Sequence, residues 1–500
     1  MRNRLAILIT LMIGLNSALA ACGDSASDNA VDSANDTDGN TAQTSASDDG
    51  SLDNLPELDF DGEVINVLYR DDVVNSFYVA ESTGDIVDDA VYAANRAVEE
   101  RINVDFNLIT QAGTADADRT TYISAITNSV MAGDNAYDLT AILTYNIPTL
   151  IQSGVLLNLL DVQYLDFDQP WWVGDLTEMA TINGKLYFAS GDVSLELTQK
   201  IFCMLFNKDL AETLNSGDIY QLVLDGKWTL DNMKTLATAA YADLNGNTAV
   251  DPEDRYGLVV NDLNSLSGFI ASFGMEITTP DDDGVQHINF ATERTVDAIQ
   301  ALTDLLNDND GIFYQNKSDA LPETVAANHD VYRAMFKNNN LLFITTEFNQ
   351  IATIFRDMQS EYGVIPYPKF DESQTEYNTV ARNTYSSFAI PKTCTKTDAV
   401  GAALEALASE NYRTTSHVYF ETALKVKYSR DDVTSQMYDI IKDGMKFNFG
   451  YTFNGIINNV INLYCNVVAG DQVWTTEYAA QESAIETSLS KFYEDVREIE

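Results

Sequence analysis

Residues 63–69, EVINVLY, decide the fold class, because this run is typical of a buried β-strand and opens a regular β-α-β-α-β series. An amphipathic helix is predicted over 85–101 and a second strand over 104–109. A second helix over 120–132 and a third strand over 137–143, YDLTAIL, complete the series. This alternation indicates an α/β fold with a parallel sheet and helical crossovers.

The rest of the chain contains more strands and helices than a single βαβ domain can use. We therefore predict two α/β lobes connected by chain crossings. Further strands are predicted over 185–189, 201–206, 341–345, 362–366 and 388–391. Further helices are predicted over 229–242, 292–306, 324–336, 397–409 and 477–500.

Residues 1–21 have the layout of a secretory signal peptide. Arg2 and Arg4 precede an apolar run over 5–15, and small residues follow before Cys22. As a helix the apolar run spans about 16 Å, whereas the hydrocarbon layer of a membrane is about 30 Å thick, which disfavours a transmembrane helix. The sequence Leu-Ala-Ala-Cys, ending at Cys22, resembles the lipobox of bacterial lipoproteins. This resemblance implies that Cys22 is diacylated and anchors the protein outside the cytoplasm, at the cell membrane.

Residues 22–57 are predicted to form a disordered acidic tether behind the lipidated cysteine. They consist largely of Asp, Ser, Ala, Asn, Thr and Gly and contain no Lys or Arg. Such a segment buries too little apolar surface to offset the entropy lost on ordering. A low-complexity tail without a role is the alternative.

The charge of the chain limits its partners. With 76 Asp and Glu against 29 Lys and Arg, the formal net charge is −47. This field repels nucleic acid and anionic lipid headgroups and disfavours phosphorylated ligands, whereas it permits neutral or cationic ones. An acidic surface is also an ordinary means of staying soluble, so the charge by itself selects no ligand.

Enzyme motifs are missing from the sequence. The three histidines show neither metal-ligand nor nucleophile–base spacing, and no phosphate-binding glycine loop or hydrolase motif occurs. Among 76 acidic residues, carboxylate pairs arise by chance. We therefore predict that the protein is not an enzyme. The three cysteines after Cys22 show no disulfide or zinc spacing, and Cys203 is predicted to be a small core residue.

Residues 243–254 have the spacing of an EF-hand-type calcium loop. Position 6 is Thr248 instead of Gly, and position 12 is Asp254, which has a shorter side chain than the usual Glu. The sequence predicts a structural Ca²⁺ here, and an Asx-rich turn without metal is the alternative. The predicted ligands are the side chains of Asp243, Asn245, Asn247, Asp251 and Asp254 and the backbone carbonyl of Ala249.

Several aromatic residues fall at predicted strand ends or in loops, beside polar residues. Ligands of α/β proteins collect at strand ends. A neutral sugar needs flat apolar faces for stacking and planar hydrogen-bonding groups for its hydroxyls. Taken singly, an aromatic residue is more often part of the core than of a ligand site, which is the alternative for each candidate. The candidates are Tyr69, Tyr145, Trp171, Trp172, Tyr385, Tyr451 and Phe453, with Arg70 and Asp71 directly after Tyr69.

From residue 58 to 500 the sequence resembles the extracellular solute-binding proteins of family 1, the maltose-binding-protein type. Six sequence blocks carry the resemblance and occur in the expected order: Asn183–Tyr187, Leu205–Leu210, Gly226–Thr229, Tyr362–Pro368, Ala389–Lys392 and Ala423–Ser429.

The resemblance implies a type II periplasmic-binding-protein fold, with two lobes, hinge strands and a ligand cleft that closes around the solute. Lobe one is expected to comprise 58–187 and 346–410, and lobe two 188–345 and 411–500. The hinge segments are expected at 187–192 and 343–348.

The resemblance also implies ligand-binding positions. Polar residues after the first strand correspond to Arg70 and Asp71, and the aromatic residue of a late helix corresponds to Phe453, where maltose binders have Trp. Asp192 is expected from its place in the hinge. Asn454 follows Phe453 and is expected to bind sugar hydroxyls.

The implied function is that of a monomeric substrate-binding lipoprotein of an ABC importer. Such a protein captures a neutral mono- or oligosaccharide and delivers it to membrane permease subunits. A surface-anchored glycosidase, an adhesion module, or a receptor for a non-sugar solute such as a peptide or polyamine are the alternatives.

Overall fold

The computed structural model describes residues 53–260, 263–313, 325–427 and 431–499. The predicted signal peptide, the lipidation site Cys22 and the tether up to residue 52 lie outside these residues. Among the described helices, none is both long and apolar enough to cross a membrane.

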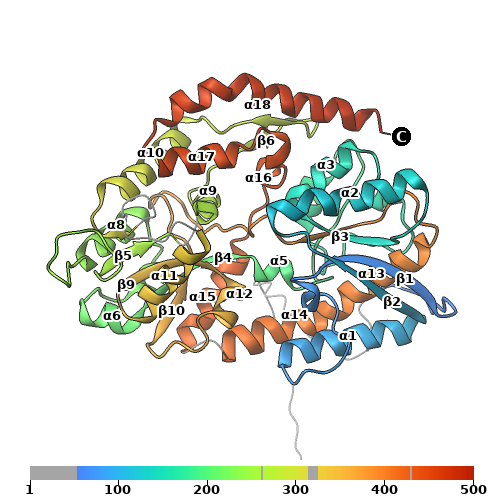
Figure 1. Ribbon diagram of the computed structural model, residues 1–500, viewed down its shortest axis with the longest axis horizontal. Coiled ribbons are helices and arrows are strands. Elements are labelled where there is room, and N and C mark those ends of the chain that lie inside the picture. The colour runs from blue at the N-terminus through green and yellow to red at the C-terminus, as the bar shows by residue number, and fades with distance from the viewer. Residues whose placement is uncertain (1–52, 261–262, 314–324, 428–430, 500) are drawn as a thin grey trace, which may run out of the picture. The chain divides into compact units, whose positions relative to one another are not determined.

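The first sheet forms from the predicted β-α-β-α-β series, and its strand order is β11-β3-β1-β2. The β1 strand pairs in parallel with β2 along its whole length and with β3 on its other side, whereas β11 is antiparallel to β3. The parallel α/β arrangement expected from the sequence is therefore confirmed (Figure 1). The strands are β1 (Glu63–Arg70), β2 (Val104–Gln111), β3 (Leu139–Leu143) and β11 (Ser386–Ala389), and the crossover helices are α1 (Ile86–Ile102) and α2 (Asp116–Ala132).

Local signals place the ends of α1. The side chain of Asp85 accepts a hydrogen bond from the backbone N–H of Val87, which satisfies an otherwise unpaired donor of the first turn. At the other end, Asn103 adopts the left-handed conformation with φ of 52°, and β2 begins at the next residue. Between these caps, Val91 and Val98 are buried on the side of the helix that faces the core.

The second sheet has the order β10-β4-β9-β5-β8. Its β4 strand is buried at every residue, including the predicted core residue Cys203. The prediction of a strand over 185–189 is wrong, because this segment forms only isolated bridges, such as the one from Ala189 to Phe388. The strands are β4 (Phe202–Asn207), β5 (Tyr256–Val259), β8 (Ile312–Phe313), β9 (Leu341–Glu347) and β10 (Tyr362–Ile365).

Long helices cover the sheets. In Figure 1, α18 runs along the top, where it contacts α10 and α17 at one end and α3 at the other. The long helices are α8 (Leu230–Ala240), α10 (Glu293–Asp308), α11 (Val325–Lys337), α13 (Thr397–Arg413), α15 (Asp432–Asp443), α17 (Val460–Ala469) and α18 (Trp474–Arg497). Shorter elements are α3 (Ile147–Gln152), α4 (Gly174–Ala180), α5 (Glu196–Gln199), α6 (Lys208–Thr213), α7 (Ile219–Leu224), α9 (Gly268–Ser272), α12 (Phe348–Thr353), α14 (Thr415–His417), α16 (Phe449–Thr452), β6 (Thr278–Pro280), β7 (Gln286–Ile288), and the 3₁₀ and π turns η1 (Val74–Ser76), η2 (Thr144–Asn146), η3 (Leu159–Asp161), η4 (Leu263–Ser267), η6 (Val418–Lys427) and η7 (Asn454–Ile456).

The structure corrects the expected division of the chain between the lobes. Residues 346–410 were expected in lobe one, yet β10 pairs antiparallel with β4 of the second sheet. The second hinge segment was expected at 343–348, but these residues lie in or directly after β9, inside the second sheet. The reason is that strand pairing joins residues far apart in sequence, which local pattern does not reveal.

Two antiparallel chain segments cross between the sheets instead. One leads from Ala189 to Ile201, and the other from Ala381 to Phe388. Bridges join Ala189 to Phe388 at the first sheet and Ile201 to Ala381 near the second. These two segments connect the sheets of the two lobes.

A buried ion pair ties the first crossing to the first sheet. Arg70, at the end of β1, is 1% exposed, and its Nη2 donates to Glu196 Oε2 of α5 at 2.5 Å and to Ser386 Oγ of β11 at 3.1 Å. Its Nη1 donates to Thr114 Oγ1 at 2.8 Å. Burial raises the pKa of Glu196, and the charge of Arg70 opposes that rise. Arg70, expected to bind ligand, therefore holds together β1, β11 and the crossing segment.

The adjacent tryptophans are also internal. Trp171 and Trp172 are 1% and 3% exposed. Their indole N–H groups donate to Glu405 Oε1 at 3.1 Å and Oε2 at 2.9 Å, so α13 holds both rings in the core of the first lobe. Burial raises the pKa of Glu405 to about 7. Trp171 and Trp172, predicted as candidate ligand-binding residues, therefore lie in the core, because a carboxylate far along the chain accepts from both indoles.

The predicted tether also ends earlier than expected. Asp53 is 8% exposed, and both of its carboxylate oxygens accept from Arg101 at 2.6 Å. Residues 53–57 therefore belong to the folded part of the chain.

Replacing Arg70 by Met should lower the free energy of unfolding by about 3–5 kcal/mol, because Glu196 then stays buried without its cation. Adding Glu196→Gln should recover part of this loss. Chemical denaturation followed by circular dichroism measures both effects. Arg294→Met is the matched control, since the Arg294–Asp371 pair is 39% and 41% exposed and should contribute less than about 1 kcal/mol. Equal effects of the two single variants would contradict the structural role of Arg70.

Glu405 predicts a pH dependence of stability. Its pKa rises from 4.5 to about 7 on folding, so between these pH values the folded state binds more protons than the unfolded state. The contribution of Glu405 to stability is therefore lost as the pH rises through this window. Relative to Glu405→Gln, which does not titrate, wild type should lose about 2 kcal/mol between pH 5 and pH 8. Urea denaturation at both pH values tests this, and a pH-independent difference would refute it.

Candidate ligand-binding site

A cavity of about 440 Å³ lies between the two lobes, beside the second crossing segment. The first lobe contributes residues of α2 and of the turn after β3, and the second lobe contributes residues of η4, α16, η7 and α17. The lining residues are Asp116, Arg119, Thr120, Ile123, Tyr145, Asn146, Asn264, Ser267, Arg382, Asn383, Thr384, Tyr451, Asn454, Ile461 and Asn462.

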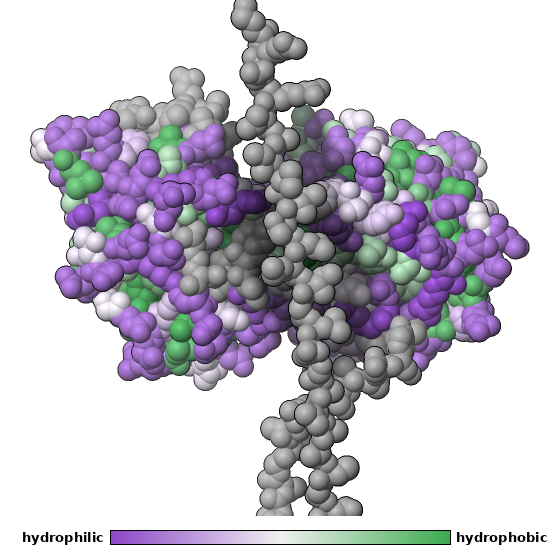
Figure 2. Space-filling model, turned by 90° about the horizontal axis from the view of Figure 1, so that it is seen from below, coloured by the Kyte–Doolittle hydropathy of each residue, from purple (hydrophilic) through white to green (hydrophobic). Residues whose placement is uncertain are grey.

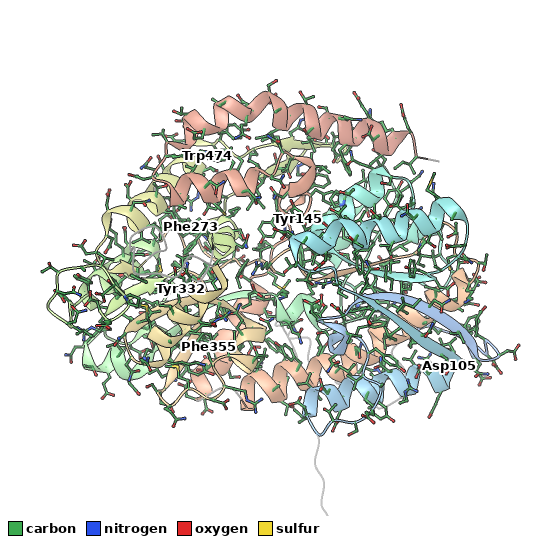
Figure 3. All side chains as sticks on the ribbon, in the orientation of Figure 1. Asp105, Tyr145, Phe273, Tyr332, Phe355 and Trp474 are labelled. Carbon is green, nitrogen blue, oxygen red and sulfur yellow. The ribbon has the colours of Figure 1, made fainter. Side chains whose placement is uncertain are left out.

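Tyr145 connects the two sides of this cavity (Figure 3). It follows β3, and its backbone N–H donates to the carbonyl of Asn383 in the crossing segment at 3.0 Å. Its phenol donates to Oδ1 of Asn459 at 2.6 Å, immediately before α17 of the second lobe. Burial raises the pKa of Tyr145. A side chain of the first lobe therefore makes a direct hydrogen bond to the second.

Two arginines line the cavity, and carboxylates hold both in place. Nη1 of Arg119 lies 2.6 Å from Asp116, and its guanidinium carbon lies 5.4 Å from the ring centre of Tyr145. Nη1 of Arg382 lies 3.0 Å from the buried carboxylate of Glu347. Each arginine side chain remains 25% exposed. Fixed planar donors of this kind suit hydroxyl or carboxylate groups of a ligand.

The second-lobe side of the cavity is built around two predicted residues. The hydroxyl groups of Tyr451 and Ser267 are hydrogen-bonded at 3.0 Å. Oδ1 of Asn454 accepts from the backbone N–H of Ile461 at 2.9 Å, which fixes the amide at the start of α17. Burial raises the pKa of Tyr451 well above its ordinary value. Tyr145, Tyr451 and Asn454 are thus the predicted ligand residues that the structure brings together at this cavity.

Other predicted aromatic residues are part of the core. Tyr69 is fully buried and stacks on Phe77 with ring centres 5.0 Å apart. Tyr385 is 2% exposed. Phe453 is fully buried and stacks on Phe449 at 4.2 Å, so it presents no face to the cavity.

The predicted acidic residues lie elsewhere. Asp71 is exposed on the surface after β1 and does not line the cavity. Asp192 accepts a hydrogen bond from Ser416, and burial raises its pKa to about 6. Asp192 lies in the first crossing segment, and its carboxylate faces the α14 region instead of the cavity.

Sequence reasoning missed the arginines and most of the asparagines. Arg119 lies in the first turns of α2, which follows the carboxyl end of β2, so the strand-end rule could have identified it. No local sequence pattern could have identified Arg382 and Asn383. Their segment crosses between the lobes because it pairs with residues that are distant in sequence.

The predicted metal ligands lie together in one loop outside this cavity. The loop joins α8 to β5, and Ala242 and Arg255 close its base with two backbone hydrogen bonds of 3.0 Å. Within the described residues, no three His, Cys, Asp or Glu side chains form a group that could hold a metal ion. A metal here would therefore also require the amides and the carbonyl of the predicted set.

A second cavity, of about 520 Å³, shares Tyr451 with the first. It lies between α4 of the first lobe and residues 270–286 and 446–449 of the second. Three acidic residues line it: Asp175, Glu178 and Glu276.

Comparison with known proteins supports the fold and identifies the family. Residues 100–410 match the family model described as bacterial extracellular solute-binding protein. No curated protein gives a significant match.

Solved structures match almost along their whole length. The maltose-binding periplasmic protein of Listeria monocytogenes in complex with maltose is 15% identical, with 86% of this chain and 99% of that chain covered and a TM-score of 0.56. The cyclic α-maltosyl-1,6-maltose binding protein of Arthrobacter globiformis is 13% identical, with 86% and 100% covered and a TM-score of 0.56. An ABC substrate-binding protein of L. monocytogenes in complex with cycloalternan is 15% identical, with 87% and 98% covered and a TM-score of 0.51.

These structures share the two-lobed fold, which confirms the fold expected from the sequence. The family match spans more than half of the chain and agrees with the resemblance in the sequence blocks. The chain therefore belongs to the bacterial extracellular solute-binding proteins.

Proposed function

We propose that this protein is the substrate-binding lipoprotein of an ABC importer and that it captures a neutral carbohydrate in the cavity between its lobes. The observation that carries the proposal is the cavity itself, in which Tyr145 of the first lobe and Tyr451 of the second are surrounded by planar polar groups. The proteins named above bind maltose or cyclic oligosaccharides, and this supports a carbohydrate as the ligand here.

The chemistry of the lining supports a sugar. Five asparagines and two arginines line the cavity, together with three hydroxyl side chains from Ser and Thr and the two tyrosines. Amides both donate and accept, as sugar hydroxyls do, and guanidiniums add fixed donors. A volume of about 440 Å³ lies in the range of small-molecule sites. The net charge of −47 disfavours a phosphorylated ligand.

Capture in this proposal is a closure step without chemical change of the ligand. The ligand enters between the lobes, and the two crossing segments act as the hinge. The hydrogen bond between Tyr145 and Asn459 adds a direct contact between the lobes once they have closed. The closed surface then docks on the permease, and the lipid on Cys22 keeps the receptor beside it.

A glycosidase would need two carboxyl groups about 5–10 Å apart across the bound sugar. The described lining of the first cavity supplies one, Asp116, which is paired with Arg119. This lining favours a receptor over a two-carboxylate hydrolase. Incubation with a chromogenic glycoside decides between them, since release of the chromophore would refute the receptor proposal.

A thermal-shift screen tests the ligand class. Maltose, maltodextrins and cyclic oligosaccharides should raise the melting temperature, because a ligand that binds only the folded state stabilises it. Amino acids, short peptides and polyamines form the other arm of the screen. Stabilisation by members of that arm alone would refute the carbohydrate assignment.

Replacing Tyr145 by Ala should weaken binding of the sugar found in this screen by about 1–3 kcal/mol, because a stacking face and the contact to Asn459 are both lost. Tyr145→Phe keeps the ring and should cost about 1 kcal/mol or less. Isothermal titration calorimetry measures both. Tyr92→Ala on α1, outside the cavity, is the control and should leave affinity unchanged. Unchanged affinity in Tyr145→Ala would place the sugar elsewhere.

A further inference from the structure

In the loop over residues 243–254, side chains accept hydrogen bonds from backbone N–H groups of the same loop. Asp243 accepts from the backbone N–H groups of Gly246 at 2.6 Å and Thr248 at 3.0 Å. Asn245 accepts from the N–H of Asn247 at 2.9 Å. Each of these bonds turns the backbone back toward the start of the loop.

The second half of the loop continues in the same way. Asn247 accepts from the N–H of Ala249 at 2.6 Å, and Asp251 accepts from that of Glu253 at 2.9 Å. These bonds order the loop but do not by themselves require a ligand, since an Asx-rich turn makes similar ones.

The backbone turns sharply at the sixth position. Thr248 has φ of 58°, in the left-handed region that residues with a β-branched side chain rarely adopt. Calcium loops of the EF-hand type place a glycine there for the same turn. The chain therefore makes the EF-hand turn in spite of the unfavourable residue.

A buried carboxylate provides the independent observation. Asp254 is 0% exposed, and its Oδ2 has no hydrogen-bond partner. Its Oδ1 accepts from the N–H of Leu244 at 3.0 Å, which directs the carboxyl group into the loop. A buried carboxylate oxygen without a partner is costly unless a cation or donor meets it.

The loop also lacks a cation of its own. Within the described residues, the ion pairs of lysine and arginine include none with Asp243, Asp251 or Asp254. The nearby arginine, Arg255, donates its Nε to the backbone carbonyl of Ala240. The carboxylates of Asp243, Asp251 and Asp254 thus share one loop without a lysine or arginine partner among the described residues.

From this geometry we infer that residues 243–254 bind a Ca²⁺ ion. The donors are all oxygens, from carboxylates, amides and a carbonyl, which is the set that Ca²⁺ prefers over Zn²⁺ or Cu²⁺. Each amide oxygen of Asn245 and Asn247 accepts one backbone N–H and has a second lone pair for the ion. The ligands are Asp243, Asn245, Asn247, Asp251 and Asp254 through their side chains and Ala249 through its carbonyl.

The ion stabilises the junction between α8 and β5. The phenol of Tyr256, the first residue of β5, donates to the carbonyl of Asp251 at 3.1 Å, and its ring lies 5.5 Å from that of Tyr241 at the end of α8. Since β5 pairs with β9 in the second sheet, the ion would hold a strand of that sheet to its covering helix. This role does not depend on which solute the protein binds.

Terbium luminescence tests the site directly, because Tyr241 and Tyr256 lie beside the loop and can sensitise a bound Tb³⁺. Adding Tb³⁺ to the full-length, chelator-treated chain should give a saturable signal on tyrosine excitation. Ca²⁺ should displace it with an apparent Kd between about 10⁻⁶ and 10⁻³ M, and Mg²⁺ at the same concentrations should not. Calcium should also raise the melting temperature, and EDTA should reverse this shift.

Asp254→Asn keeps the shape of the buried side chain and should weaken Ca²⁺ binding at least about tenfold. Asp251→Asn is the second variant and should have the same effect if Asp254→Asn does not fold. The control is Asp281→Asn, because Asp281 also accepts from backbone N–H groups, of Asp283 and Val285, in an acidic turn without calcium-ligand spacing. Its Ca²⁺ affinity should equal that of wild type.

The inference is overturned if folded wild type gives neither a saturable terbium signal nor a calcium-dependent melting shift. Equal Ca²⁺ affinity in wild type and in a folded Asp254 or Asp251 variant would also overturn it.

Discussion

The buried ion pair between Arg70 and Glu196 is the interaction on which the arrangement of the lobes depends. Arg70 stands at the end of β1, and its partners come from three other segments: α5, β11 and the approach to α2. Glu196 lies in the first crossing segment and Ser386 at the end of the second, so one guanidinium joins both crossings to the first sheet. Because a buried carboxylate without its cation is strongly unfavourable, this junction is fixed where the lobes meet.

The same constraint governs the other buried acids of this highly acidic chain. Most acidic residues can stay in water, and the face in Figure 2 is largely hydrophilic, with hydrophobic residues scattered in small groups. Each buried acid needs a partner of its own. Glu196 pairs with a guanidinium and Glu405 accepts from two indole N–H groups, whereas Asp254 accepts from the backbone N–H of Leu244 and forms no ion pair with a lysine or arginine of the described residues. Glu196 and Glu405 thus stabilise the fold through partners from the chain, whereas Asp254 is a proposed ligand of the Ca²⁺ ion.

The cavity follows from this architecture. The crossing segment that brings Ser386 to Arg70 also carries Arg382 and Asn383 to the cavity wall. The turn after β3 supplies Tyr145, whose backbone is bonded to the same segment. Polar groups of both lobes therefore converge on one space because the crossings hold them there, and Tyr145 of the first lobe is hydrogen-bonded to Asn459 of the second.

The sequence by itself determined the features that depend on neighbours along the chain. These are the β-α-β-α-β series, the calcium-ligand spacing of residues 243–254 and, through its sequence blocks, the family. Only the tertiary structure decided which aromatic residues meet the cavity. Trp172 and Tyr145 are both predicted ligand residues, yet Trp172 lies in the core, where its indole N–H donates to Glu405 of a helix more than two hundred residues away. Periodicity and spacing are local properties, whereas burial and strand pairing depend on partners that the fold brings together from distant parts of the chain.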